Sequence, residues 1–392
     1  MKNIENQKNL LGKRVLLRLD LNVPLQDGII QDETRISKIL PTLKFLIQKQ
    51  AKIIIISHAG RPKGKIVPAL SLKLICTNLS EKLNQKINLI TDDIRKIENK
   101  DLFKNIDGNI LVLENIRFYP EEENNDSNFS QHLASFADVY INDAFSCSHR
   151  AHASVTSITK FLPSYCGLQF NSEVTALKKV TSEIEKPISC IIGGSKISTK
   201  IGIIKNLIPK FDNIIIVGGM ANNILSYKNV KIGKSIHEEN CNEIVKNIFE
   251  TSKQYSCSII YPEDVITSKS LDGKPEPKKL NDISDDDMIL DIGEKTIKKI
   301  DNLINSSKTI LWNGPAGYFE NNDFANGSFQ IAKSIVKNHK SNSIYSVAGG
   351  GDTISVLNKI NAINDFNFIS TAGGAFLEYL EGKEIPGISA LN

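Results

Sequence analysis

Short aliphatic and β-branched runs alternate with longer amphipathic stretches through the first part of the chain. Residues 14–19 and 52–56 are predicted strands, and residues 43–49 between them have helical spacing. The same rhythm continues through strands predicted at 109–113 and 138–141. Strands that alternate with helices are typical of a parallel sheet covered by helices. We therefore expect an α/β domain over residues 1–168.

A second α/β pattern follows a helical stretch at residues 169–185, which is expected to end before Pro187. We interpret residues 169–187 as a connecting helix. Nearly all strands beyond it end in glycine, in the segments SCIIGGSK, NIIIVGGM, TILWNGPAG, IYSVAGGGD and FISTAGGA. Ligands of doubly wound sheets bind at the carboxyl ends of strands, where glycine lets the backbone approach a phosphate. Residues 188–380 are thus predicted to form a phosphate-binding domain.

The length and composition support this division and exclude other classes. A chain of 392 residues exceeds the size at which one hydrophobic core keeps growing. Lys and Arg number 48 against 44 Asp and Glu, which argues against a nucleic-acid binder. The six cysteines form no Cys-x-x-Cys pair and suggest free thiols, and the longest apolar run, residues 53–56, cannot cross a bilayer. Without the apolar segment of a signal peptide, the protein is expected in the cytoplasm.

The common nucleotide-binding motifs are absent from the sequence. Gly233–Lys234–Ser235 resembles the end of a P-loop, but Lys228 occupies the required upstream glycine position. No Gly-x-Gly-x-x-Gly follows the first strand, which counts against the alternative of a nicotinamide-dependent dehydrogenase. A nucleotide would have to be held by other groups.

Polar side chains that can bind anions follow the predicted strands of the first domain or open its first helix. They are Arg18, Asp20, Asn22, Arg35, His58, Arg61, Arg117, His149 and Arg150. The planar guanidinium group pairs bidentately with carboxylate and phosphate oxygens, so converging arginines suit a ligand that bears both groups. Taken singly, each arginine is equally consistent with a solvated surface position, each histidine with a structural role, and Asp20 with a turn.

The second domain contains its own candidates. Lys196 and Lys200 in GGSKISTK are four residues apart, which places both on one face of a predicted helix, where a polyphosphate would offset their repulsion. A solvated basic face is the alternative. Asp352 in GGGDT could cap a helix or offer an oxygen ligand to magnesium. Glu320 in GPAGYFE could accept hydrogen bonds from a ribose.

Long segments of the chain resemble the signatures of the phosphoglycerate kinase family and follow the family's order from about residue 13 to the C-terminus. They are RLDLNVP, SHAGRPKG, ENIRFYPEE, NDAFSCSHRAHAS, GGSKISTKI, WNGPAGYFE, VAGGGDT and LEGKEIPGISAL. The resemblance implies two doubly wound, Rossmann-like parallel-sheet domains joined by the connecting helix and a hinge. It implies a monomeric glycolytic kinase that interconverts 1,3-bisphosphoglycerate plus ADP with 3-phosphoglycerate plus ATP. Residues 381–392 are expected to return to the first domain.

The resemblance also assigns roles residue by residue. The substrate-binding residues would be Asp20, Asn22, Arg35, His58, Arg61, Arg117 and Arg150. The nucleotide would be held by Lys200, Glu320, Gly350, Gly351, Asp352 and Thr353, with Mg²⁺ on Asp352 directly or through water. Arg35, Lys196 and Lys200 would act on the transferring phosphoryl group.

The sequence departs from the family pattern at its glycine turns. Val217 replaces the first glycine of a triple, and Ala372 replaces a glycine of the family's Thr-Gly-Gly-Gly-Ala-Ser. We expect Ala372 to occupy a backbone position that favours positive φ, and Phe376, in place of a small hydroxyl residue, to lie near the phosphates. Altered nucleotide affinity is one consequence. A phosphate-ligand binding protein without catalysis remains the non-enzymatic alternative.

Overall fold

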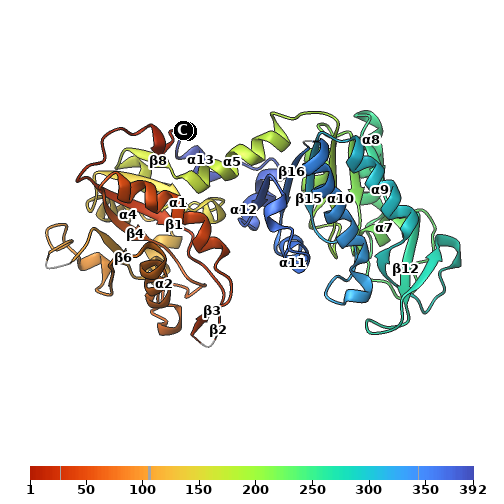
Figure 1. Cartoon of the computed structure of the whole chain (residues 1–392), viewed down its shortest axis with the longest axis horizontal. Coiled ribbons are helices and arrows are strands. Elements are labelled where there is room, and N and C mark those ends of the chain that lie inside the picture. The colour runs from red at the N-terminus through yellow and green to blue at the C-terminus, as the bar shows by residue number, and fades with distance from the viewer. Residues whose placement is uncertain (27, 105–106, 343) are drawn as a thin grey trace. The chain divides into compact units, whose positions relative to one another are not determined.

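The computed structural model describes residues 1–26, 28–104, 107–342 and 344–392. The chain forms two compact units (Figure 1): the first comprises Met1–Thr175 and Glu384–Asn392, and the second Ala176–Lys383. The division falls inside helix α5 (Leu168–Thr181), between the boundaries at 168 and 188 that the sequence suggests. The predicted hinge itself stays a prediction.

The first unit is built on a parallel sheet of order β5-β6-β4-β1-β7-β8. Leu16 of the central strand β1 pairs with Ile54 of β4 on one side and Tyr140 of β7 on the other. The predicted strands 14–19 and 52–56 are confirmed to the residue. The strands are β5 (Ile87–Ile90), β6 (Ile110–Leu113), β4 (Lys52–Ile56), β1 (Arg14–Leu19), β7 (Val139–Asp143) and β8 (Ser164–Cys166).

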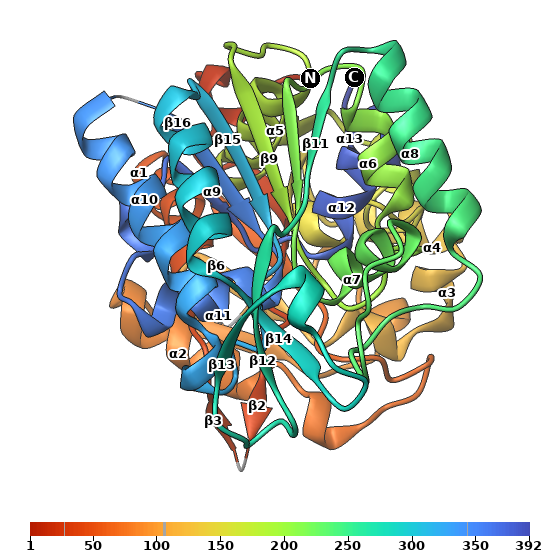
Figure 2. The same ribbon diagram turned by 90° about the vertical axis from the view of Figure 1, so that its right-hand side faces the viewer.

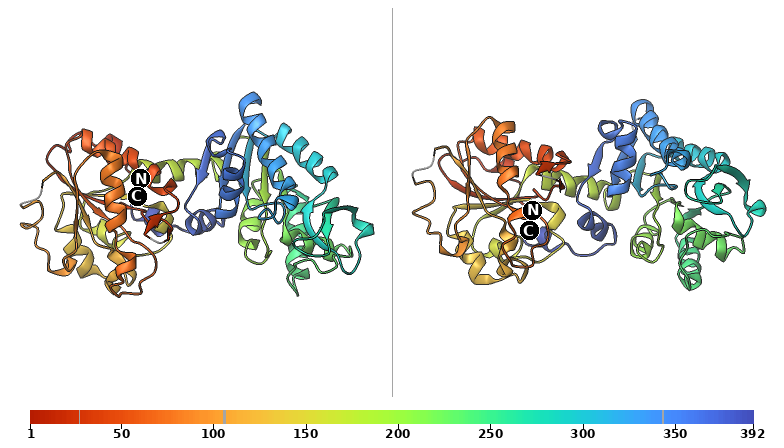
Figure 3. Two further views of the ribbon diagram at one scale, coloured as in Figure 1. Left: turned by 60° about the horizontal axis from the view of Figure 1, so that its bottom comes forward. Right: turned by 90° about the horizontal axis from the view of Figure 1, so that it is seen from below.

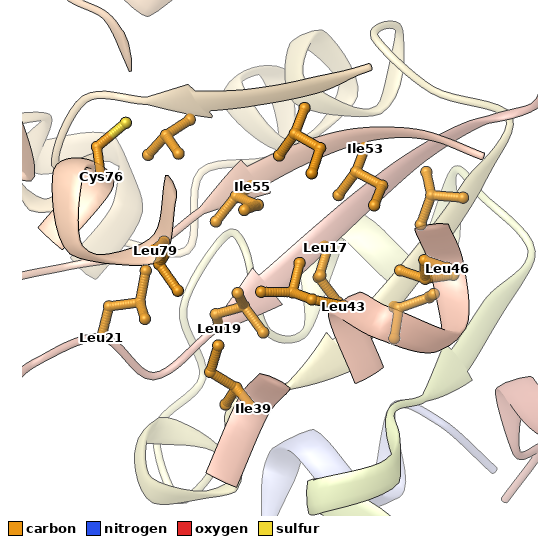
Figure 4. Packing of buried hydrophobic residues seen from close by; sticks show 14 of the residues in the cluster. Leu17, Leu19, Leu21, Ile39, Leu43, Leu46, Ile53, Ile55, Cys76 and Leu79 are labelled. Carbon is orange, nitrogen blue, oxygen red and sulfur yellow. The ribbon is translucent and has the colours of Figure 1, made fainter. Parts of the chain in front are cut away.

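Both faces of this sheet are buried, which explains why its strands read as nearly continuous apolar runs. Successive side chains of a strand point to opposite faces. Leu17 and Leu19 therefore pack with Leu43 of α1 (Figure 4), whereas Leu16 belongs to the core on the opposite face. The helices and the small hairpin of the unit are α1 (Thr34–Gln48), α2 (Lys73–Leu83), α3 (Pro120–Glu123), α4 (Ser127–Ala134), α13 (Pro386–Ser389), β2 (Leu25–Gln26) and β3 (Ile29–Ile30).

The C-terminal segment packs within the first unit. The Gly387 N–H donates to the Ser148 carbonyl at 2.8 Å, and a Cβ at Gly387 would lie 2.5 Å from the Ser148 side chain. Close packing of this kind requires a glycine. Both chain ends lie near each other in this unit in the two views of Figure 3.

The second unit is built on another parallel sheet, of order β11-β10-β9-β15-β16-β17. In chain order, β10 and β11 are added on one side of β9. After an antiparallel three-stranded insertion of order β13-β12-β14, the strands β15, β16 and β17 are added on the other side. The reversal lies between β9 and β15, and in doubly wound sheets such a point is where ligands bind. The strands are β9 (Ile188–Ile192), β10 (Asn213–Ile216), β11 (Ser258–Ile260), β12 (Asp264–Ser268), β13 (Glu276–Lys279), β14 (Met288–Ile292), β15 (Thr309–Asn313), β16 (Tyr345–Gly349) and β17 (Phe368–Ser370).

Helices cover both faces of the second sheet. In Figure 2, α9 and α10 lie on one side of it and α6 and α8 on the other. The single tryptophan, Trp312 of β15, is completely buried in the core that includes Ile300 of α9 and Ile335 of α10. The helices are α6 (Ile201–Leu207), α7 (Gly219–Tyr227), α8 (Asn242–Gln254), α9 (Glu294–Ser306), α10 (Asn326–Asn342), α11 (Gly351–Lys359) and α12 (Gly374–Leu380). The predicted fold class, two parallel-sheet α/β domains, is confirmed.

Two helix predictions are wrong. The connecting helix does not reach Glu185: α5 ends at Thr181, where the N–H groups of Ser182 and Glu183 both bond back to the Lys178 carbonyl. This pattern closes the last turn before Pro187 has any influence.

Lys196 and Lys200 do not share a helix face, because α6 begins only at Ile201. The residues before it form a turn, in which Ser198 donates to Glu238 from its N–H at 2.8 Å and its hydroxyl at 2.6 Å. These two bonds to a carboxylate forty residues away hold the turn before the helix begins. The two lysines therefore lie on a loop and at a helix N-cap.

No helix in the described part of the chain combines the length and hydropathy of a membrane span. All six cysteines are buried and free, as the spacing predicts.

Candidate active site

The first candidate site lies at the carboxyl edge of the first sheet. The loops after β1, β4, β6 and β7 meet at this edge because these strands are parallel neighbours. The Asp20 carboxylate, after β1, pairs with Arg35 Nη1 at 3.1 Å and accepts the Ser146 hydroxyl at 2.5 Å. Arg35 is the second residue of α1, and Ser146 follows β7. These contacts join segments that are far apart in sequence.

A second set of contacts holds the loop after β4. The Gly60 N–H donates to Asn22 Oδ1 at 2.8 Å, and Arg117 Nη1 donates to the Gly60 carbonyl at 3.0 Å. Arg61 comes next and is exposed, and among the described residues its side chain has no hydrogen bond or ion pair. The structure thus brings Asn22 and Arg117 together, while Arg61 stands apart from their contacts.

Positive charge accumulates at this edge. Burial and the nearby Arg18 lower the pKa of Arg117, and Arg150 acts in the same direction. Burial and neighbouring arginines also lower the pKa of His58 well below its usual value, and that of His152 to about 3. Burial is the first cause of each lowered pKa, and the neighbouring positive charges add to it; a ligand with several anionic oxygens would offset this second contribution. The edge has the electrostatics of an anion site.

Arg18 itself is not a ligand-facing residue, contrary to the sequence prediction. Its side chain is completely buried, and its guanidinium donates to Ser154 and to the carbonyl of Leu19. Arg150 and His149 are only half-buried, and Arg150 Nε donates to His149 Nε2 at 3.3 Å. The difference follows from position, because Arg18 lies inside β1, whereas His149 and Arg150 come after β7 and so can reach the edge of the sheet.

The second candidate site lies at the reversal point of the second sheet. Glycines let the ends of β9 and β15 touch: a Cβ at Gly193 would lie 2.1 Å from the Pro315 carbonyl oxygen, and one at Gly314 would lie 2.2 Å from the Gly193 oxygen. A cavity of about 510 Å³ opens here, with Gly218, Asn222, Pro315, Glu320 and Asp352 among its lining residues. Its size suits a small organic ligand.

Lys200, the N-cap of α6, contacts the end of one strand of this sheet. Its ammonium donates to Asn313 Oδ1 at the end of β15. Burial lowers the pKa of Lys200, and the carboxylate of Asp352 acts in the opposite direction, so the two charges interact. Lys196, by contrast, is exposed. Hydrogen bonds from Ser198 lower the pKa of Glu238, and the charge of Lys196 makes a smaller contribution in the same direction.

The start of α11 differs in detail from the prediction. Gly350, with φ +97°, is the N-cap, so Asp352 does not cap the helix and lies exposed in its first turn beside Gly351. Only glycine adopts such a φ readily. Thr353 is buried, and its hydroxyl accepts the Gly314 N–H at 2.7 Å. The segment therefore presents a carboxylate next to a helix N-terminus.

Two expectations about the altered glycine turns are wrong. Ala372 does not have a positive φ; the residue that does is Gly373, with φ +54°. Phe376 is completely buried, and its ring lies 2.6 Å from where a Cβ at Gly349 would be. It fills the core below β16 instead of lining the cavity. Val217 is also buried in the core, so none of the three changes places a side chain in the cavity.

The residues at this edge fit a nucleotide-bound magnesium ion better than a permanent metal centre. Among the described residues, no three His, Cys, Asp or Glu side chains are grouped to hold a metal. Mg²⁺ is commonly held by one or two carboxylates together with substrate phosphates and water. The exposed carboxylate of Asp352 on the cavity wall matches that donor set.

The family model described as phosphoglycerate kinase matches residues 4–383. The chain belongs to the phosphoglycerate kinase family. It is a kinase, a transferase of glycolysis, and the family acts on phosphoglycerate and a nucleotide. This membership decides against the dehydrogenase alternative.

Relatives and solved structures agree with this membership over nearly the whole chain. The phosphoglycerate kinase of Wolbachia sp. subsp. Drosophila simulans (strain wRi) is 46% identical and covers 99% of this chain and 98% of its own length. The phosphoglycerate kinase structure from Coxiella burnetii has a TM-score of 0.90 at 36% identity, covering 98% of this chain and 97% of that one. The structure from Pyrococcus horikoshii OT3 has a TM-score of 0.83 at 28% identity, covering 100% and 98%.

Three residues that lie at or next to the two candidate sites were not predicted from the sequence. Asn313 binds Lys200 and donates to the Gly349 carbonyl at 2.6 Å, and Ser146 binds Asp20. Both are polar residues just at or after a strand end, which was the available signal. Glu122 is completely buried in α3. It ends the segment ENIRFYPEE, but it does not follow a strand end, and nothing in that segment distinguishes it from Glu121.

Proposed function

We propose that the chain catalyses reversible phosphoryl transfer between 1,3-bisphosphoglycerate plus ADP and 3-phosphoglycerate plus ATP. The observation that carries this proposal is the cluster of buried and half-buried arginines at the first sheet edge, in a chain of this family. A three-carbon acid with a phosphate and a carboxylate presents anionic oxygens that can pair with the guanidinium groups of this cluster. The cavity of the second unit supplies a separate place for the nucleotide.

In this proposal the substrate is held by Asp20, Asn22, Arg35, His58, Arg61, Arg117 and Arg150. Arg35 is already oriented by Asp20, and Arg117 by the Gly60 carbonyl, so little side-chain entropy is lost when an anion binds. The exposed Arg61 is the exception and would have to be ordered by the ligand.

The nucleotide is held by Lys200, Glu320, Gly350, Gly351, Asp352 and Thr353. Glu320 on the cavity wall accepts ribose hydroxyls, and the exposed N–H groups at the start of α11 face the phosphates. Asp352 would hold Mg²⁺ directly or through water, and the bound ion would neutralise phosphate charge.

The transfer itself needs positioning and positive charge more than covalent chemistry. The substrate carboxylate is ionised at neutral pH, so no general base is required. Arg35, Lys196 and Lys200 stabilise the negative charge on the equatorial oxygens of the moving group. Because the two ligands bind to different units, the units close around them, with α5 and its flanks as the hinge, and exclude water. We further propose that the protein acts as a monomer in the cytoplasm.

A coupled assay tests this function. With 3-phosphoglycerate, ATP and magnesium, we expect ADP to form, and we expect its formation to stop when any one of the three is omitted. ADP formation without 3-phosphoglycerate would contradict the proposal. Binding of 3-phosphoglycerate in a calorimeter without any turnover would support the non-catalytic alternative.

Arg150→Ala is expected to raise the KM for 3-phosphoglycerate by roughly tenfold to a hundredfold, with kcat changed less than about threefold. The reason is that Arg150 contributes to the positive edge but not to the proposed transfer step. Steady-state kinetics would show this. Arg95→Ala is the matched control, because Arg95 pairs with Asp93 and Glu121 on the surface. An unchanged KM in Arg150→Ala would remove this residue from the substrate site.

A further inference from the structure

The buried Arg18 makes one contact that concerns the substrate site. Its Nη2 lies 3.0 Å from Nδ1 of His58. The other two nitrogens also bond inside the protein, Nε to the Ser154 hydroxyl at 2.9 Å and Nη1 to the Leu19 carbonyl at 2.7 Å, and the whole side chain is completely buried. Arg18 therefore cannot reach a ligand, and any effect on the substrate has to pass through His58.

The contact with the Arg18 guanidinium determines which ring nitrogen of His58 carries the proton. A guanidinium carries only N–H donors, offers no acceptor and stays charged in proteins. At 3.0 Å from it, Nδ1 has to be the acceptor and so carries no proton. In a neutral imidazole the proton is then on Nε2. His58 can offer a hydrogen-bond donor at Nε2 alone.

The surroundings keep the ring neutral. His58 is 4% exposed, and the groups that face it are Arg18, Arg35, Arg117 and His152. Burial, followed by the charge of Arg18, lowers the pKa of His58 well below its usual value. A further positive charge, on the imidazole ring, would be repelled by these arginines.

A carboxylate is linked to Arg18 through Ser154. Glu122 is completely buried and accepts hydrogen bonds from Ser154, at 2.9 Å from its N–H and 2.6 Å from its hydroxyl. The Ser154 hydroxyl thus donates to Glu122 and accepts from Arg18. The chain Glu122–Ser154–Arg18–His58 gives each donor an acceptor, and such networks fix side-chain orientation.

We propose that Arg18 is a positioning residue, which holds His58 as the neutral Nε2–H tautomer and so presents an N–H donor, never a lone pair, to the anionic substrate. The inference rests on the proposed function, in which His58 contacts 3-phosphoglycerate. A lone pair in that position would repel carboxylate or phosphate oxygens, and a charged ring would make substrate affinity depend on pH. Arg18 prevents both.

NMR of the full chain, labelled with ¹⁵N in its six histidines, tests the proposal without substrate. The His58 signals are assigned by their loss in His58→Gln. We expect His58 to carry its proton on Nε2 and to show no titration between about pH 5.5 and 8.5. A proton on Nδ1, or titration in that range, would overturn the proposal. Because no turnover is needed, this result is independent of the proposed reaction.

Arg18→Met keeps the length of the side chain and removes its donors. We expect His58 to populate both tautomers or to titrate near its ordinary pKa, and the KM for 3-phosphoglycerate to rise roughly tenfold and to vary with pH between about 6 and 8. The KM for ATP should change less than about twofold.

Ser154→Ala is the matched control, since it removes the acceptor of Arg18 Nε but leaves the bond to His58. We expect it to keep the wild-type tautomer. A raised KM in Arg18→Met with an unchanged tautomer would show that Arg18 acts only structurally and would overturn the inference. If Arg18→Met does not fold, the wild-type spectrum decides alone.

Discussion

Lys200→Ala is expected to lower kcat by about a thousandfold while the KM for 3-phosphoglycerate stays within about twofold of wild type. The ammonium is partly buried, bonded to Asn313 and close enough to Asp352 for their charges to interact. Positive charge in such a place stabilises negative charge far more than it does in water. In the proposed function the substrate binds on the other unit, so its ground-state affinity should not change. Steady-state kinetics in both reaction directions would measure the split.

Two further variants sharpen this expectation. Lys205→Ala removes an exposed lysine of α6 outside the proposed site and is the matched control; we expect wild-type kinetics. Lys200→Arg keeps the charge but not the compact ammonium, and we expect intermediate activity, because the larger fork does not fit the single acceptor of Asn313. Wild-type turnover in Lys200→Ala would remove this residue from the transfer step.

Much of the fold could be predicted because its signals are local. The strand from Arg14 to Leu19 reads as an apolar run because both faces of the sheet are covered. The glycines that end the predicted strands of the second unit are also visible in the sequence, although the cause at Gly193 and Gly314 is a contact between the ends of β9 and β15 that leaves no space for a side chain. A feature that is visible in a short stretch of sequence could therefore be predicted.

Other features could not be predicted because they depend on distant partners. Arg18 looks like a ligand in RLDLNVP, yet Ser154, which is 136 residues away, holds it inside the protein. Lys200 looks helical in its segment, but Glu238 holds the preceding turn. From the sequence, the side chain of Phe376 is expected near the phosphates. In the structure its ring is buried in the core, in space that the missing side chain of Gly349 leaves open. In each case a tertiary contact overrides the local pattern.

Gly314→Ala is expected to lower the free energy of unfolding of the second unit by about 3 kcal/mol or more and to weaken ADP binding at least tenfold. Gly314 has φ +103°, and its added Cβ would lie 2.2 Å from the Gly193 oxygen and 2.5 Å from its carbonyl carbon. These are backbone atoms and cannot move aside as a flexible side chain can. Relief requires β9 and β15 to separate at the point where the cavity opens.

Tryptophan fluorescence can follow the unfolding of the second unit. Trp312 is buried and donates from Nε1 to the Gly314 carbonyl at 2.8 Å, so its fluorescence during urea unfolding follows the second unit. Gly351→Ala is the matched control for stability, because Gly351 has no positive φ and a Cβ there meets nothing within 4 Å. We expect its unfolding free energy to change by less than about 0.5 kcal/mol. If Gly314→Ala unfolded like wild type and bound ADP normally, the contact between the two strand ends would not shape the nucleotide site, and the reversal point would lose its assigned role.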